Sequence, residues 1–156
     1  MTFTIRDAVP ADAETIAAFN AAMAEETEDK PLDEATVLAG VCALLDDPTR
    51  GRYWLVEDGA RIVGQTMATR EWSDWRNGWF WWLQSVYIVP EARRQGVFRA
   101  LYDHVCEAAR AAGACGLRLY VEHENTGAQQ TYVALGMADA GYAMMEVAFT
   151  PDTETA

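Results

Sequence analysis

The sequence is poor in the features that mark several common classes of protein. It has a single lysine, Lys30, and three cysteines, Cys42, Cys106 and Cys115, which form no CxxC pair. An odd number of cysteines without such a pair argues against a disulfide framework, and we expect reduced thiols in a cytoplasmic protein. No apolar run approaches the length of a membrane span, and the first residues lack the basic-then-apolar order of a signal peptide. We therefore expect no membrane partner.

Positive charge is scarce as well. The formal net charge is −12, and a surface this acidic repels the phosphates of DNA and RNA, so we expect no nucleic-acid partner. Such a surface favours a cationic small molecule or a basic peptide as partner. The alternative is that the acidity serves solubility alone.

The chain has the length and apolar content of one domain. It is 51% apolar, enough for one sizeable core, and no linker or repeat divides it, so residues 1–156 are predicted to form a single domain. Apolar periodicity predicts strands near 2–8, 52–70 (a hairpin turning at Asp58-Gly59), 79–89, 115–122 and 140–149, and helices near 12–23, 33–45, 97–112 and 125–135. The order β-α-α-β-β-β-α-β-α-β predicts an α/β (α+β) domain with a central mixed sheet.

The stretch VYIVPEARRQGVFRALYDHV, residues 86–105, places arginines and one glycine between a strand and a helix. The free backbone N–H groups of a helix's first turn and the helix dipole attract an anion, usually a phosphate. Gly96 lacks a Cβ where backbone and ligand would come close. A well-capped surface helix with ordinary arginines is the alternative. A Walker loop and a GxGxxG dinucleotide loop are both disfavoured, because Gly96 stands alone.

This stretch resembles the coenzyme A signature of the GNAT superfamily of N-acetyltransferases, commonly written (Q/R)xxGx(G/A). Arg93 and Gly96 match it, whereas Phe98 stands at the second small-residue position. The later segment HENTGAQQTYVALGM is similar to the family segment in which an asparagine starts a helix and a tyrosine follows seven residues on, here Asn125 and Tyr132. The resemblance covers nearly the whole chain. It implies a GNAT-like single domain whose mostly antiparallel sheet of about six to seven strands is flanked by about four helices.

The resemblance also implies how acetyl-coenzyme A would bind as co-substrate. The strand before the signature would bulge and expose backbone groups of Val86, Tyr87 and Ile88 to the pantetheine arm, which Asn125 would also reach, beyond its role as a helix N-cap. The Phe98 ring crowds the pyrophosphate unless it turns away. The pyrophosphate would lie on the signature residues Arg93, Arg94, Gln95, Gly96, Val97, Phe98 and Arg99.

For catalysis, the resemblance points to Tyr132 as the acid that protonates the leaving thiolate. Its alternative role is a half-buried core tyrosine. The base stays open: the preceding strand offers Gln84, which we assign to substrate binding, and Ser85, and both are poor bases. Four carboxylates remain as candidate bases, namely Glu71, Asp74, Glu122 and Glu124. His123 between two of these is interpreted as surface, and no metal is expected.

Tryptophans gather in EWSDWRNGWFWWLQSV, residues 71–86. Trp81 and Trp82 suit a strand buried on both faces. Trp72 and Trp75 are predicted to lie in a polar loop, where they would line an acceptor pocket that holds a cation or form a dimer contact.

The leading interpretation is an acetyl-coenzyme A-dependent N-acetyltransferase that acts by direct transfer to an amine of a small molecule or peptide. A catalytically weak acyl-coenzyme A-binding or sensing module is the second hypothesis. An interaction protein that uses the aromatic patch is the third. A homodimer is common in the family, and we carry it as an open expectation.

Overall fold

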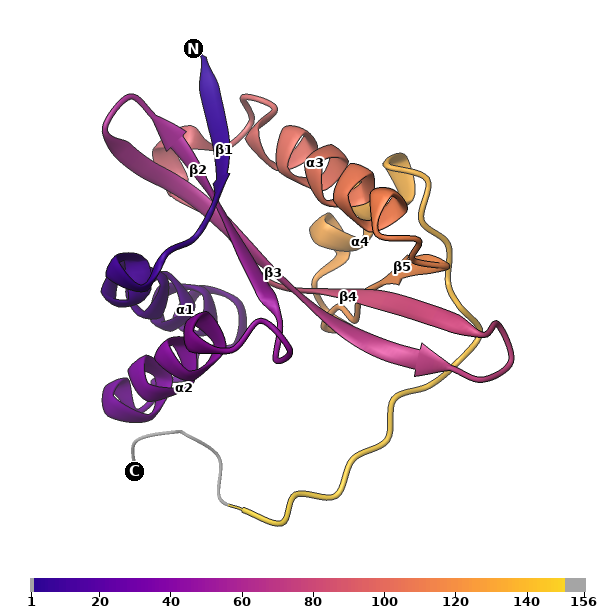
Figure 1. Cartoon of the computed structure of the whole chain (residues 1–156). Helices are drawn as coiled ribbons and strands as arrows, with labels where there is room; N and C mark the ends of the chain where they lie inside the picture. The colour runs from indigo at the N-terminus through magenta and orange to yellow at the C-terminus, as the bar shows by residue number, and fades with distance from the viewer. Residues whose placement is uncertain (1, 151–156) are drawn as a thin grey trace.

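The computed structural model describes residues 2–150 as one layered α/β unit (Figure 1). Short 3₁₀ turns at Pro10–Asp12 and Pro90–Ala92 precede two of its helices. The elements are β1 (Phe3–Asp7), α1 (Ala13–Glu28), α2 (Glu34–Asp46), β2 (Arg52–Asp58), β3 (Arg61–Ser73), β4 (Gly78–Ile88), α3 (Val97–Ala111), β5 (Gly116–Arg118) and α4 (Thr126–Ala134). Within this part of the chain no helix combines the length and apolar character needed to cross a membrane.

The sheet is mixed and mostly antiparallel, as the sequence predicts. Strands β1 to β4 pair antiparallel in chain order, and β5 joins β4 in parallel. The predicted hairpin forms at Asp58-Gly59, where Gly59 has a φ of 61° that suits a tight turn. The fold class is confirmed. The described sheet has five strands, slightly fewer than the six to seven expected.

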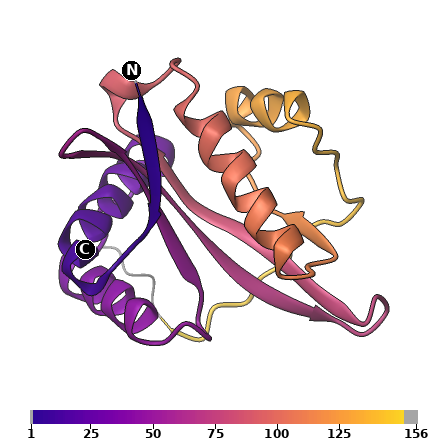
Figure 2. The same ribbon diagram turned by 45° about the horizontal axis from the view of Figure 1, so that its top comes forward.

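Helices cover both faces of the sheet (Figure 2). Helix α3 buries Leu101 and Val105 against one face, in a core that includes Trp54 and Leu83. Helices α1 and α2 pack on the opposite face, where Tyr53 and other apolar residues of β2 are buried. Because successive side chains of a strand point to opposite faces, β2 contributes to both cores, and its residues 53–56 are all buried. The core therefore lies mainly on the first four strands.

The last predicted strand, 140–149, is not formed in the described chain. These residues are exposed and pair with no strand, and the strand predicted at 115–122 shortens to Gly116–Arg118. A strand is stable only when a neighbour takes up its backbone hydrogen bonds. Among residues 2–150, β5 has such a neighbour on the β4 side only, so both predictions fail at the same edge of the sheet.

Candidate active site

Strand β4 carries a bulge at Ser85. Gln65 of β3 pairs with Tyr87 and Met67 pairs with Gln84, so β4 holds one extra residue there. Ser85 has a φ of 52°, a conformation that costs energy for a residue with a side chain. The side chains of Gln65 and Thr66, which are both buried, hold the bulge by donating to the carbonyls of Ser85 (3.2 Å) and Gln84 (3.0 Å).

Beyond three residue pairs, β4 and β5 separate. Only Phe80–Trp82 of β4 pair with β5, through Gly116–Arg118. The close approach of the two strands depends on Gly116, since a Cβ there would lie 2.7 Å from the Phe80 ring. From Leu83 to Ile88, β4 therefore has strand backbone without a neighbour on the β5 side among the described residues. Backbone groups on this side that make no other hydrogen bond can pair with an extended ligand, whereas the carbonyl of Ile88 already accepts from Arg93.

Helix α3 begins directly beside this opening. Its N-cap, Gly96, has a φ of 81°, and no side chain caps the helix. No heavy atom lies within 4 Å of the position that a Cβ on Gly96 would occupy, so space remains above the loop. The uncapped N–H groups of the first turn, at residues 97–99, are available to an anion.

The signature arginines take different places. Arg93 turns toward α1, where it forms an ion pair with Glu26 at 2.7 Å and donates to the carbonyl of Ile88 at 2.9 Å. The Tyr87 hydroxyl donates to the same carboxylate at 3.2 Å, and burial and this carboxylate raise the pKa of Tyr87. Arg99 pairs with Asp103 on its own helix. The backbone of Arg94 adopts a φ of 61°, and this side chain is exposed at the loop.

Glu26 is thus a residue of this region that sequence reasoning missed. It lies in the acidic run EETED at the end of α1, far from the signature in the sequence. No local pattern distinguishes it from its exposed acidic neighbours. Its contacts with Tyr87 and Arg93 fix the signature loop to α1 and to β4.

The structure brings Phe98 and Tyr132 together. Their rings meet edge to face with centroids 5.8 Å apart, and Phe98 also contacts Tyr102. Burial raises the pKa of the Tyr132 phenol, so its neutral, proton-carrying form is favoured. Asn125 starts α4 and accepts a hydrogen bond from the backbone N–H of Ala128 at 3.2 Å, which is the N-cap role expected for it.

The candidate bases are distributed over the surface. Glu71 accepts hydrogen bonds from Arg118 (3.0 Å) and from the Trp82 indole (3.2 Å). Asp74 lies in the β3–β4 turn, and Glu122 and Glu124 lie in the exposed segment before α4. Within the described chain, no three His, Cys, Asp or Glu side chains are placed to hold a metal ion together.

A sequence model of the acetyltransferase (GNAT) family matches residues 14–137. The chain belongs to this family. Members are acyltransferases that use acetyl-coenzyme A as co-substrate. The signature loop, the bulged strand and the helix with Tyr132 all lie inside the matched region.

Three relatives describe the similarity. A possible acetyltransferase from Clostridium difficile 630 is 42% identical, with a TM-score of 0.89 over 97% of this chain and 100% of its own. The thialysine N-ε-acetyltransferase of Bos taurus is 35% identical over 81 residues, 52% of this chain and 47% of the relative, so this chain spans about half of that protein. A ribosomal-protein-alanine N-acetyltransferase from Brucella melitensis biovar Abortus 2308 shares only the fold, at 17% identity and a TM-score of 0.77 over 96% of this chain and 100% of its own.

The local structure of this GNAT protein fits the co-substrate. The β4 backbone from Leu83 to Ile88, which has no strand on its β5 side among the described residues, suits an extended pantetheine arm, and the uncapped start of α3 suits a pyrophosphate. The departure at Phe98 fits as well, because its ring packs on Tyr102 and Tyr132. The chain thus has a place for the pantetheine arm and a place for the pyrophosphate of the co-substrate.

Of the two tryptophans predicted to lie in a polar loop, Trp75 does and Trp72 does not. Trp72 belongs to β3 rather than to a loop, and its ring packs edge to face on Trp79 at 5.1 Å. Trp75 lies in the turn and is 89% exposed. The turn precedes Gly78, seven residues before the bulge and about 23 Å away along an extended strand. Trp81 is buried as predicted, and Trp82 is half-buried.

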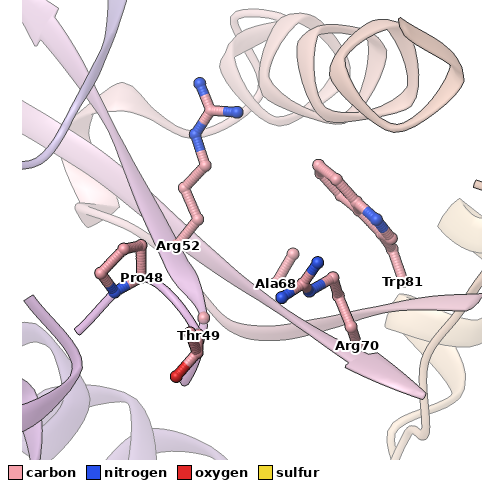
Figure 3. A pocket seen from close by; sticks show the side chains of 7 residues that line it. Pro48, Thr49, Arg52, Ala68, Arg70 and Trp81 are labelled. Atoms are coloured by element: carbon pink, nitrogen blue, oxygen red, sulfur yellow. The ribbon is translucent and has the colours of Figure 1, made fainter. Parts of the chain in front are cut away.

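A separate pocket of about 350 Å³ opens between the turn after α2 and strands β2 to β4 (Figure 3). Arg52 and Arg70 line it beside the Trp81 ring, and they would repel a cationic amine. Arg52 is paired with Asp7, and the Arg70 guanidinium lies 5.0 Å from the centre of the Trp79 ring. None of the signature residues lines this pocket.

Proposed function

We propose that this protein transfers the acetyl group of acetyl-coenzyme A directly to an amine of a small molecule or peptide in a ternary complex. The observation that carries the proposal is the opened β4 backbone beyond Ser85, which lies next to the uncapped start of α3. Acetyl-coenzyme A supplies the activated thioester acyl group. The chain's own residues would bind and orient this co-substrate and would transfer protons to and from the reacting groups.

Three sets of groups would hold the co-substrate. The backbone of Val86, Tyr87 and Ile88 would pair with the pantetheine arm, and Asn125 would approach it from the start of α4. The first-turn amides of α3, with the side chains of Arg94 and Gln95, would bind phosphate. Arg93 would contribute indirectly. Its ion pair with Glu26 ties the signature loop to α1, so its side chain turns toward the protein rather than into solvent.

Tyr132 would supply the proton. Its phenol is partly buried, which raises its pKa and keeps the proton on the oxygen at neutral pH. Its ring is held against Phe98, so the hydroxyl has a defined direction. A carboxylate or a water molecule would deprotonate the acceptor amine. Among the candidate carboxylates, Glu71 is weaker than the other three because Arg118 already pairs with it.

The acceptor would be cationic before it loses its proton. The end of α1 carries Glu25, Glu26, Glu28 and Asp29, all exposed, on a chain with a net charge of −12. This acidic end adjoins β4 through the contact between Glu26 and Tyr87. A relative that acetylates thialysine, an amino acid with a terminal amine, supports the same class of acceptor. Gln84, next to the bulge, would contact this substrate.

A thiol-release assay tests the proposal. Acetyl-coenzyme A is offered with thialysine, lysine, polyamines, aminoglycosides and short peptides, and melting temperature is recorded in parallel. Thiol release with one class of amine, reduced in Tyr132→Phe, is the expected result. A melting temperature raised by acetyl-coenzyme A without any turnover would favour the sensing module instead, since a ligand of the folded state stabilises it. Absence of both effects would contradict both functions.

A further inference from the structure

The pocket that Arg52 and Arg70 line has no part in the acetyl transfer proposed above (Figure 3). Its volume of about 350 Å³ lies within the range of small-molecule sites. The turn at Pro48, Thr49 and Gly51 forms one wall, and strands β2, β3 and β4 form the rest. Charged and aromatic side chains line this pocket, whereas the groove for acetyl-coenzyme A offers mainly backbone groups. The pocket therefore suits a ligand of a different kind.

The strand register brings the two arginines to one face of the sheet, beside Trp81. Arg52 pairs with Ala68 of β3, and Arg70, two residues further along β3, pairs with Trp81 of β4. Paired residues share a face, and so do residues two apart on one strand. Arg52 and Arg70 are thus diagonal neighbours, about 7–8 Å apart at the backbone. The small side chain of Ala68 lies next to both and leaves room for a ligand.

Aromatic rings hold both guanidinium groups. The guanidinium carbon of Arg52 lies 4.8 Å from the centre of the Trp54 ring, and that of Arg70 lies 5.0 Å from the centre of the Trp79 ring. A guanidinium over a ring face can still direct its N–H donors to a carboxylate, whose two oxygens match the planar fork. Both arginines are therefore placed in advance for an anionic ligand.

The charges beside the pocket favour a ligand with a single negative charge. Arg52 already donates to the Asp7 carboxylate at 2.5 and 3.1 Å. Within residues 2–150, Arg70 forms no ion pair. The two arginines and Asp7 together leave one net positive charge, on a chain whose formal net charge is −12. A phosphate dianion would be repelled by Asp7 and by the acidic surface more strongly than a carboxylate would be.

Trp81 gives the pocket an apolar wall. The residue lines the pocket although only 8% of its surface is exposed, because its ring also packs against Trp54, with the ring centres 6.0 Å apart. Pro48 and Ala68 add apolar surface. An aromatic ring in a ligand would pack against the indole in an offset or edge-to-face arrangement. The lining thus combines a place for one carboxylate with a place for one ring.

We propose that this pocket binds a small aromatic monocarboxylate, with the carboxylate on the N–H donors of Arg70 and Arg52 and the ring against Trp81. The site is distinct from the groove for acetyl-coenzyme A. Trp81 precedes the bulge at Ser85 by four residues, about 13 Å along an extended strand. The aromatic acid and the co-substrate would therefore occupy the protein at the same time.

Calorimetry with four small probes tests the class of ligand. Phenylacetate carries both the ring and the single charge, phenylacetamide lacks the charge, acetate lacks the ring, and phenyl phosphate carries a second charge. Phenylacetate should bind most tightly, and phenylacetamide should bind at least about tenfold more weakly, because it loses the charge-assisted hydrogen bonds. Equal or tighter binding of any of the other three probes would overturn the proposal, as would a lack of binding by phenylacetate in the millimolar range.

Substitution of Arg70 tests the site. Arg70→Gln should weaken phenylacetate at least about tenfold, and Arg70→Lys, which keeps the charge without the fork, should lose less. Arg76→Gln is the matched control: Arg76 is exposed in the β3–β4 turn, lies over the Phe80 ring at 5.2 Å and does not line the pocket. Arg70 is also exposed, so all three variants should keep the circular dichroism of the parent. Equal affinity of Arg70→Gln and Arg76→Gln for phenylacetate would refute the proposal.

Nuclear magnetic resonance locates the bound acid. The Nε–Hε signals of Arg52 and Arg70 should shift with phenylacetate, whereas those of Arg94 and Arg99 in the signature should not. The same shifts should appear with coenzyme A in excess. Shifts at Arg94 or Arg99, or displacement of phenylacetate by coenzyme A, would place the acid in the co-substrate groove and refute the separate site. Since none of these readouts depends on turnover, failure of the acetyl transfer and failure of this site are distinguishable.

Discussion

The ring of Phe98 stands edge-on to the ring of Tyr132, with their centroids 5.8 Å apart. The residue that departs from the glycine-rich signature thus supports the residue proposed as the proton donor. Helix α4 has no fully buried residue, so this contact is one of the few that fix its position on α3. The ring packs on Tyr132 of α4, so we predict that a side chain in place of a small residue here leaves co-substrate binding intact.

Phe98→Ala tests whether the Phe98 ring supports Tyr132 or crowds the pyrophosphate of the co-substrate. We expect turnover to fall because Tyr132 loses its neighbour, and we expect the free energy of unfolding to drop by about 2 kcal/mol, less than the roughly 3–5 kcal/mol lost at a fully buried phenylalanine. Affinity for acetyl-coenzyme A, measured by calorimetry, should be preserved or improved. Phe98→Leu, which keeps apolar volume, serves as the control. Weaker binding in Phe98→Gly or Phe98→Ala would show that the ring helps to hold the co-substrate.

Tyr132→Phe removes the phenol oxygen and keeps the ring against Phe98. We expect kcat to fall about 100-fold, the lower end of what a general acid contributes, with an unchanged melting temperature. Tyr142→Phe is the matched control, since Tyr142 is 75% exposed. Equal turnover in the two variants would remove the acid role from Tyr132.

The pH dependence follows from the same phenol. Its pKa is raised above the ordinary value of about 10, so the protonated form persists through neutral and mildly alkaline pH. We expect the midpoint of the loss of kcat due to this group to lie above about pH 10, and we expect this loss to be absent in Tyr132→Phe. A falling limb near pH 8 that disappears in this variant would contradict the raised pKa.

Ser85 offers a test of the bulge. Ser85→Gly should remain within about 1 kcal/mol of the parent, because glycine accepts the positive φ and loses more entropy on folding. Ser85→Val should cost roughly 2 kcal/mol, since a β-branched side chain is strained at that φ. Urea unfolding measures both, and acetyl-coenzyme A titration should show weaker binding in Ser85→Val alone. Equal stability of the two variants would mean that the bulge relaxes without cost.

Asp12 supplies a prediction on acid stability. This buried carboxylate accepts from Arg6 at 2.8 and 3.0 Å and from the Val9 N–H at 2.7 Å, and the hydrogen bond from Arg6 is the main cause that lowers its pKa. A folded-state pKa below the unfolded value of about 3.9 gives a stabilisation that is full above that value and is lost as pH falls through the folded pKa.

Asp12→Asn should therefore cost about 1–3 kcal/mol at pH 7 and flatten the loss of stability below about pH 4. Chemical unfolding at several pH values measures both effects. Glu107→Gln on the exposed side of α3 is the control. A parallel pH profile in Asp12→Asn and the parent would assign the acid sensitivity to other carboxylates.

The sequence predicts those structural features that depend on residues adjacent in the chain. The Asp58-Gly59 turn and the glycine before α3 follow from local conformational preferences, and both are found. The Arg93–Glu26 pair joins residues 67 positions apart, and no periodicity identifies such a partner. The strand expected at 140–149 has the right pattern but lacks a paired neighbour, because a strand's stability resides in the adjacent chain rather than in its own residues.

We expect the brief pairing of β4 with β5 to divide the molecule into two cooperative units. Strands β1 to β4 share long ladders and both cores, whereas β5 is held by three residue pairs and α4 by few buried groups. Local opening of the second unit should require much less free energy than global unfolding, so its amide hydrogens should exchange first. A molecule lodged between β4 and β5 would bridge the two units. Amide protection across residues 116–134 would then report occupancy of the groove directly, without any chemical turnover.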